Sequence, residues 1–163
     1  MENFFEDFVK EIKTKEELIL SFEEITQAER VIFEKKSGPL SEKIKGKVRE
    51  KFREFIKRME DKEILSQNPT QQRSFLEKLK KYLSSLPEVK LEIAFSPSNE
   101  FLKKINQWFN EKLAQKVILD LTINPKIVGG IVIEYKGNWR DYSLAKRIDK
   151  LIEKSIPNHG RGV

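Results

Sequence analysis

The 163-residue sequence has no cysteine and a single histidine, so the residue types that most often bind metals or act as nucleophiles are nearly absent. Without cysteine, the chain can form neither a disulfide nor a thiolate nucleophile. The one histidine, His159, lies in the segment 157–163, and the sequence shows no set of residues with metal-ligand spacing. Asp141 and Ser143 have no histidine nearby with which to form a Ser/His/Asp triad. We therefore expect no catalytic group, no cofactor and no metal.

Long apolar runs and glycine-rich phosphate loops are also missing. No apolar run approaches the roughly 20 residues needed to cross a bilayer, so we expect no direct insertion into lipid. The segment 1–12 carries four acidic residues, which suits neither a secretory signal nor an Arg-rich transit peptide. The pair Gly129-Gly130 matches neither the GxGxxG nor the Walker A pattern. We interpret this pair as structural, permitting a bulge or a close approach of two backbone segments.

The chain carries more positive than negative charge. The formal net charge is +6 and the isoelectric point is near 9.4, which favours acidic partners, nucleic acid or anionic lipid. Residues 43–62 hold nine Lys/Arg against four Asp/Glu, whereas residues 1–36 hold six against ten. The basic residues of 43–62 are mixed with glutamates around an apolar seam, which is typical of a solvated helix. Nucleic-acid binding through this segment is therefore an alternative and not the leading hypothesis.

Apolar residues recur at helical spacing through the first half of the chain. Thr14 and Glu17 have the form of a capping box that starts a second helix. The pair 38–39, Gly-Pro, breaks the chain, and Ser41 is placed to cap the next helix. That helix is expected to run without a break along one seam, which consists of Ile44, Val48, Phe52, Phe55 and Met59.

After Pro87 the apolar pattern changes from helical to alternating. Strands are expected within 89–95, 117–123 and 131–135, and helices within 99–115 and 144–156. Ser143 is the expected cap of the last helix, and Asp141 is expected to accept hydrogen bonds from turn amides. Both tryptophans, Trp108 and Trp139, are expected to pack in the core, although the position of Trp139 at a turn also suits a partner contact.

The sequence thus predicts an α+β fold. Residues 1–86 form a helical domain of about four helices, residues 87–156 form a small β-α-β-β-α domain, and residues 157–163 form a flexible tail. A strand-helix-strand crossover places its two strands in parallel. The third strand, which follows a short connection, is expected to run antiparallel to its neighbour.

One stretch of the second half resembles a known family. The order is an apolar strand, a short loop with proline, Gly-Gly before another strand, a turn with Asp-x-Ser and a Leu-rich helix, here VILDLTINPKIVGGIVIEYKGNWRDYSLAKRIDKLIE. This order is similar to the carboxy-terminal domain of the delta subunit of F-type ATP synthases, the oligomycin-sensitivity-conferring protein of mitochondria. With VKLEIAF and SNEFLKKINQWFNEKLAQ before it, the resemblance covers about residues 88–155. The motif residues are Asn124 (where the family has Asp), Pro125, Gly129, Gly130, Asp141 and Ser143.

The resemblance implies a non-catalytic stator subunit in the peripheral stalk of a proton-translocating F-type ATP synthase. Such a subunit links the membrane-anchored b-type stalk helices to the alpha subunits of the catalytic head. It implies a peripheral location on the cytoplasmic face of a cell membrane, as in bacteria. The E-type stalk subunit of vacuolar and archaeal rotary ATPases has a similar order of elements and stays an alternative. The first 86 residues are shorter than the head-binding bundle of the delta family, and their sequence does not resemble it.

A stalk helix would dock through apolar anchors spaced one turn apart, with charged residues at the rim. We expect the helices 99–115 and 144–156 to lie against one sheet and to form the two walls of a groove. In the last helix, the apolar residues are also expected to face inward. The candidate partner-binding residues are Phe101, Ile105, Trp108, Phe109, Leu144, Ile148, Leu151 and Ile152.

Overall fold

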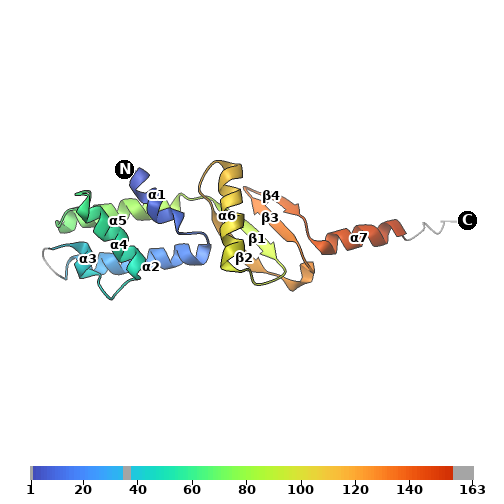
Figure 1. The fold of residues 1–163 in the computed structure, drawn as a ribbon, viewed down its shortest axis with the longest axis horizontal. Coiled ribbons are helices and arrows are strands. Elements are labelled where there is room, and N and C mark those ends of the chain that lie inside the picture. The colour runs from blue at the N-terminus through green and yellow to red at the C-terminus, as the bar shows by residue number, and fades with distance from the viewer. Residues whose placement is uncertain (1, 35–37, 156–163) are drawn as a thin grey trace, which may run out of the picture. The chain divides into compact units, whose positions relative to one another are not determined.

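The computed structural model describes residues 2–34 and 38–155. The chain divides into two compact units, unit 1 at residues 1–87 and unit 2 at residues 88–163. In the described part of unit 1 the helices are α1 (Glu2–Lys10), α2 (Lys15–Ile32), α3 (Leu40–Lys43), α4 (Glu50–Asp61) and α5 (Pro69–Ser84). The described part of unit 2 contains β1 (Glu88–Ile93), α6 (Asn99–Leu113), β2 (Ile118–Ile123), the 3-10 helix η1 (Pro125–Ile127), β3 (Ile131–Tyr135), β4 (Asn138–Asp141) and α7 (Leu144–Ser155) (Figure 1). This architecture confirms the α+β prediction. The predicted tail, 157–163 with His159, lies outside the described residues.

Helix α2 begins at the predicted capping box. The backbone N–H of Glu17 donates to the Thr14 hydroxyl at 3.3 Å, and the Thr14 N–H donates to the Glu17 carboxylate at 3.2 Å. Both bonds satisfy backbone donors that a helix start otherwise leaves without partners. The helices of unit 1 close over an aromatic cluster that consists of Phe5, Phe8, Phe52, Phe55 and Phe75.

The prediction of one continuous helix through residues 44–59 is wrong, because α3 ends at Lys43 and α4 begins only at Glu50. Gly46 adopts φ 72° in the connection, a conformation that favours glycine. The connection is then held by Glu24 of α2. The Glu24 carboxylate accepts from the backbone N–H of Arg49 and, through both oxygens, from the Arg49 guanidinium, each at 2.8 Å. A long-range ion pair thus overrides the local apolar periodicity.

Ser41 does not cap the next helix, contrary to the sequence prediction. Pro39 precedes the first turn of α3, and no side chain caps it from that position. Instead, the carboxylate of Glu60, on α4, accepts hydrogen bonds from the backbone N–H groups of Leu40 and Ser41 and from the Ser41 hydroxyl. A distant glutamate therefore satisfies the start of α3, and sequence spacing gives no sign of it.

The sheet of unit 2 has the strand order β2-β1-β3-β4. Strands β1 and β2 pair in parallel, with Val89 opposite Leu119, and β3 pairs antiparallel to β1, with Leu91 opposite Ile133. Both orientations were predicted from the order of elements. Helix α6 makes the crossover between β1 and β2 and covers one face of the sheet (Figure 1). The residues of this core are Val89, Leu91, Phe109, Val117 and Leu119, with Leu102, Ile105, Leu113, Leu121, Ile131, Ile133 and Tyr135 packed against them.

Strand β4 was not predicted, since its residues 138–141, NWRD, show no alternation of apolar and polar side chains. It forms because Lys136 and Gly137, with φ 48° and 77°, make a two-residue hairpin turn that pairs Tyr135 with Asn138. Positive φ at both central residues is the geometry that matches the twist of paired strands. The sheet therefore has four strands where three were expected.

The face of the sheet opposite α6 is polar. Lys90 and Glu134 lie opposite each other on β1 and β3, and their side chains form an ion pair at 3.2 Å. Trp139 is paired with Glu134 in the sheet, so it lies on this same face and is 58% exposed. The prediction that Trp139 packs in the core is therefore wrong.

Candidate functional site

The first turn of α7 is fixed to the neighbouring β3 segment by the motif residues. The N–H of Tyr142 donates to the carbonyl of Ile131 at 2.9 Å, and the N–H of Leu144 donates to the carbonyl of Gly129 at 2.8 Å. The Asp141 carboxylate accepts from the N–H of Ser143 at 2.8 Å. The Ser143 hydroxyl in turn accepts from the N–H of Lys146 at 3.3 Å. These contacts confirm the predicted roles of Asp141 and Ser143, and together they set the direction in which α7 leaves the sheet.

The Gly-Gly pair permits the close approach that its position suggested. Gly130 has φ 83°, and a Cβ added there would lie 2.4 Å from the Tyr142 carbonyl oxygen and 3.0 Å from the Ser143 Cα. A Cβ on Gly129 would instead meet the side chain of Leu144 at 2.9 Å. Backbone cannot yield as a flexible side chain does, so Gly130 is the more demanding of the two positions.

The Asn-Pro pair shapes the floor beneath α7. The Asn124 side chain accepts from the N–H of Lys126 at 3.0 Å, and its backbone N–H donates to the Ile93 carbonyl at 2.8 Å. Pro125 opens η1, where the missing N–H and fixed φ of proline suit the first position of a helical turn. Helix α7 packs on η1, whose Ile127 side chain is buried.

Val128 was not singled out from the sequence. It has φ 65° and ψ −37°, and the N–H of Gly129 donates to the Ile127 carbonyl at 2.7 Å across it. This is a γ-turn with a β-branched residue at its centre, a rare and strained arrangement. The Val128 side chain is 63% exposed. The turn thus presents an apolar side chain to solvent beside the root of α7.

The predicted anchors on α7 do not face inward, so that prediction is wrong. Leu144 and Ile148 are each 45% exposed and Leu151 is 66% exposed. The fixed first turn directs α7 onto η1 and not across the sheet, which leaves this row of side chains uncovered. The side chain of Ile152 lies outside those that the structure describes.

The predicted anchors on α6 divide between core and surface. Phe109 is buried, and Phe101 and Ile105 are half-buried. Trp108 is 49% exposed, with its ring edge-to-face against Phe109 at 4.9 Å, so the prediction that it lies in the core is wrong. Helix α6 packs on the sheet, whereas α7 packs on η1. The prediction that both helices lie against one sheet as the two walls of a groove is therefore wrong.

A buried polar cluster, also missed, holds the end of α6. The side-chain amide of Asn106 donates to the Val117 carbonyl at 2.9 Å, and the Val117 N–H donates to the Asn110 side chain at 2.9 Å. The two asparagines thus bond to the strand entry as another backbone segment would. Their i, i+4 spacing on an otherwise apolar face was the available sign in the sequence.

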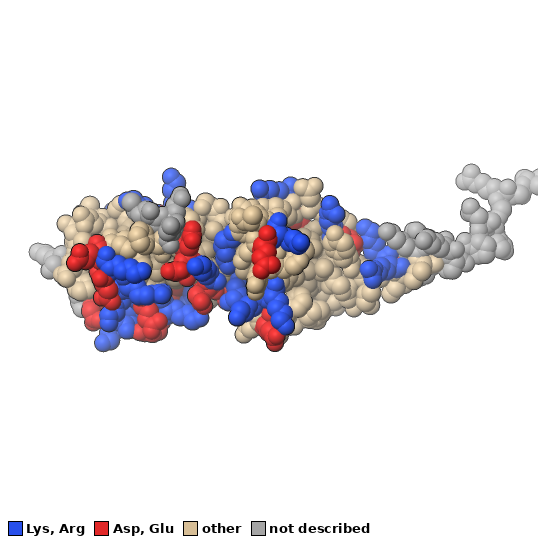
Figure 2. All heavy atoms as spheres, turned by 45° about the horizontal axis from the view of Figure 1, so that its top comes forward, with Lys and Arg blue, Asp and Glu red and all other residues tan. Residues whose placement is uncertain are grey.

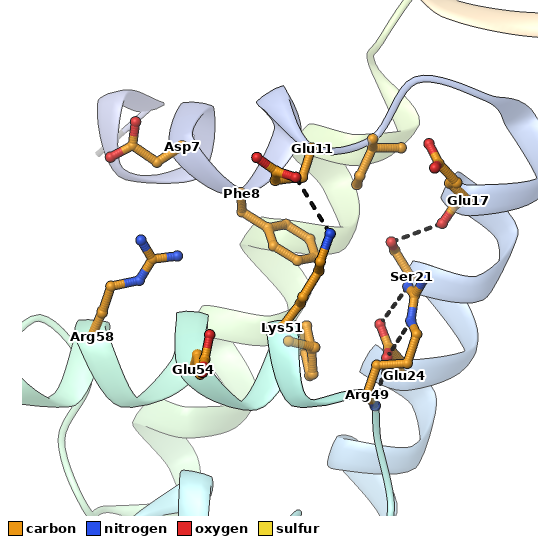
Figure 3. A pocket seen from close by; sticks show the side chains of 12 residues that line it. Asp7, Phe8, Glu11, Glu17, Ser21, Glu24, Arg49, Lys51, Glu54 and Arg58 are labelled. Atoms are coloured by element: carbon orange, nitrogen blue, oxygen red, sulfur yellow. Dashed lines mark hydrogen bonds and ion pairs between the residues drawn. The ribbon is translucent and has the colours of Figure 1, made fainter. Parts of the chain in front are cut away.

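The apolar side chains that line a pocket of about 350 Å³ in unit 1 are Phe8, Ile12 and Phe52. Figure 3 shows this pocket with its charged lining residues. Two ion pairs join charged groups around it, Arg49 with Glu24 and Lys51 with Glu11 (Figure 3). Within the described residues, no group of three or more His, Asp or Glu side chains is placed to hold a metal ion. The described residues of this pocket therefore do not form a recognisable catalytic or metal-binding site.

The basic segment around α4 is mixed in charge. The guanidinium of Arg53 bonds to the carboxylate of Glu50, which raises the pKa of Arg53 and lowers that of Glu50. On the face shown in Figure 2, Lys and Arg side chains of unit 1 are interspersed with Asp and Glu. That distribution favours a solvated surface over a phosphate-binding stripe.

Comparison with known proteins identifies one family. The model of the "ATP synthase delta (OSCP) subunit" family matches residues 2–154, so the match includes the helical unit, where the sequence had shown no resemblance. A search of curated proteins finds no match. Among solved structures, a chain of the Polytomella F-ATP synthase in primary rotary state 3 is 20% identical, with a TM-score of 0.37. That likeness covers 43% of this chain and 90% of the other, and it is too weak to establish a shared fold.

Within the described residues, no helix is both long enough and apolar enough to cross a membrane. The family match extends through both units and includes the Gly-Gly and Asp-x-Ser motif. The chain belongs to the ATP synthase delta (OSCP) subunit family and is a stator subunit of the peripheral stalk of an F-type ATP synthase.

Proposed function

We propose that this subunit binds a b-type stalk helix through α7 of unit 2 and the alpha subunits of the catalytic head through unit 1. It performs no chemistry and acts as a mechanical link, so that the head does not turn with the rotor. The observation that carries the stalk contact is the row of exposed apolar residues on α7, whose direction is set by hydrogen bonds at its first turn.

The docking surface is centred on Leu144, Ile148 and Leu151. Fully burying one such side chain contributes roughly 1.5 to 3 kcal/mol, and about half of that is still available at side chains that are half exposed. Three such side chains, together with further contacts, offset the entropy that a partner helix loses on binding.

Other predicted residues have supporting roles in this proposal. Trp108, with Phe101 and Ile105, forms a second contact on α6, and Phe109 holds Trp108 from the core. The motif residues aim α7 and do not touch the partner; they are Asn124, Pro125, Gly129, Gly130, Asp141 and Ser143.

For the division of labour, we assign residues 1–86 to a head-binding helical domain and residues 87–156 to a stalk-binding α/β domain. The extension of the family match into unit 1 supports the first assignment. Unit 1 also exposes large apolar side chains on α1 and α2 that suit a protein contact, namely Phe4, Ile19 and Leu20. The subunit then works at the cytoplasmic face of a cell membrane, held there by its partners.

The experiment is to wash membranes that contain the assembled complex, solubilise them gently, and capture this chain by a tag. Recovery of the b-type and alpha subunits together with the chain is the expected result. Recovery of the chain without either partner contradicts the proposal. Titration with labelled duplex and single-stranded nucleic acid at about 150 mM salt tests the main rival, because binding driven by phosphate contacts weakens steeply as salt rises.

A further inference from the structure

The exposed apolar row on α7 has the spacing of a coiled-coil seam. Leu144, Ile148 and Leu151 follow one another at intervals of four and three residues, which is the 3.5-residue repeat of two helices that pack side by side. The seam therefore fits one partner helix lying along α7.

Basic side chains are available on α7 and on the element against which it packs. Arg147 occupies the flanking position between Leu144 and Ile148, and Lys126 lies in η1, the element on which α7 packs. Both side chains are exposed, and neither makes an ion pair with the residues that the structure describes. Lys146, by contrast, lies over the ring of Trp139 at 5.3 Å, on the side of α7 away from the seam.

Nearby carboxylates do not compensate this charge. Residues 124–155 contain seven Lys/Arg against four Asp/Glu. Of these acids, Glu134 pairs with Lys90 on the polar face of the sheet, and Asp141 bonds to the N–H of Ser143. The other two, Asp149 and Glu153, lie on α7 itself, but Asp149 is two residues from Arg147 and so points to another side of the helix. The side of the seam that carries Arg147 is therefore basic.

We propose that the helix that docks on α7 carries Asp or Glu at the positions flanking its own apolar seam, opposite Arg147 and Lys126. This inference rests on the proposed stalk contact and specifies the chemistry of that partner. Flanking charges in paired helices select the partner and its orientation, because a partner with Lys or Arg at those positions would be repelled.

The test uses the full chain and the purified b-type stalk subunit without its membrane span, titrated at about 50 mM and about 300 mM salt. Arg147→Gln should weaken binding about two- to fivefold at low salt, and Arg147→Glu should weaken it further. Both effects should shrink at high salt. Lys45→Glu makes an equal charge change at an exposed position of unit 1 and should leave binding unchanged.

Ile148→Asp distinguishes the acidic flank of the partner from the stalk contact itself. If the stalk subunit binds, and Ile148→Asp abolishes binding while Arg147→Glu has no effect, the acidic flank is wrong and the stalk contact stands. If the stalk subunit does not bind the parent chain, the proposed function fails and this inference with it. Sedimentation of the chain alone tests a second copy as occupant: a dimer that Ile148→Asp dissociates would overturn the proposal.

Discussion

The two units of the chain differ in how many of their apolar side chains they bury. Among the described residues, unit 1 buries 20 apolar side chains and leaves 4 large ones exposed, whereas unit 2 buries 9 and leaves 9 exposed. Unit 1 adds internal ion pairs that join distant helices, such as Glu24 with Arg49. In unit 2, the exposed apolar residues include the row Leu144, Ile148 and Leu151 along α7.

This difference indicates that the apolar residues of unit 1 mainly stabilise its fold, whereas many of those in unit 2 are available for binding. Isolated exposed apolar residues are ordinary, but a contiguous row at the spacing of a helix seam indicates a partner. Unit 1 is closer to self-sufficient, because its helices satisfy one another. Unit 2 has a small core, and the hydrogen bonds of its motif residues fix α7 in a direction that leaves its apolar side chains exposed.

The largest expected effect is on binding by unit 2. Ile148→Asp or Leu151→Asp places a charge in the apolar contact, and desolvating it should weaken binding of the stalk subunit by about a hundredfold or more. Both residues are exposed, so circular dichroism should show an intact fold. The measurement is titration of the soluble stalk subunit, with Lys45→Glu as the matched control. Unchanged binding by folded variants would remove α7 from the interface.

How far the sequence predicted these two units depends on the range of the interactions involved. Local signals were sufficient for the capping box at Thr14, the parallel crossover of β1 and β2, and the Asp-x-Ser cap of α7. Interactions between distant residues were not, since the Glu24–Arg49 pair breaks a helix that the apolar spacing favours. The direction of α7 likewise depends on bonds to Gly129 and Ile131, so periodicity found its apolar face without showing that this face is uncovered.

Unit 1 should be more sensitive to the loss of an internal charge pair. Glu24→Ala removes three hydrogen bonds to Arg49 and should lower the free energy of unfolding by about 2 to 3 kcal/mol. Arg49 is partly exposed and can rehydrate, which keeps the cost from rising further. Urea unfolding followed by far-ultraviolet circular dichroism measures it. Because both tryptophans lie in unit 2, tryptophan fluorescence serves as the internal control and should change little.

Unit 2 should respond most to its backbone contact at Gly130. Gly130→Ala forces a side chain against the Tyr142 carbonyl at positive φ and should cost about 1 to 3 kcal/mol, and it should also misdirect α7. Gly129→Ala is the matched control, because its Cβ meets only the flexible side chain of Leu144. Tryptophan fluorescence during unfolding reports stability, and stalk titration reports the direction of α7. Equal effects of the two alanines would show that the close backbone approach is not what the motif requires.

The smallest expected effect is a pH dependence confined to unit 1. Lys43 is buried, and its ammonium group donates to the Ile32 carbonyl at 3.2 Å and to the Gln72 side chain at 3.1 Å. Burial lowers the pKa of Lys43 below its ordinary value of 10.5, although the negative charge of Glu60 opposes this shift. The penalty for burying the charged form is therefore present at neutral pH and below.

Between the lowered pKa and 10.5, the unfolded chain binds more protons at Lys43 than the folded chain does. The contribution of Lys43 to the free energy of unfolding therefore rises with pH through that window. Lys43→Met abolishes this rise, so the stability of the parent relative to the variant should increase from neutral pH to pH 10.5. Urea unfolding followed by circular dichroism at several pH values measures the difference, and the exposed Lys57→Met shows how large it is without burial. Parallel pH profiles for the parent and Lys43→Met would mean that the ammonium is as well solvated in unit 1 as it is in the unfolded chain.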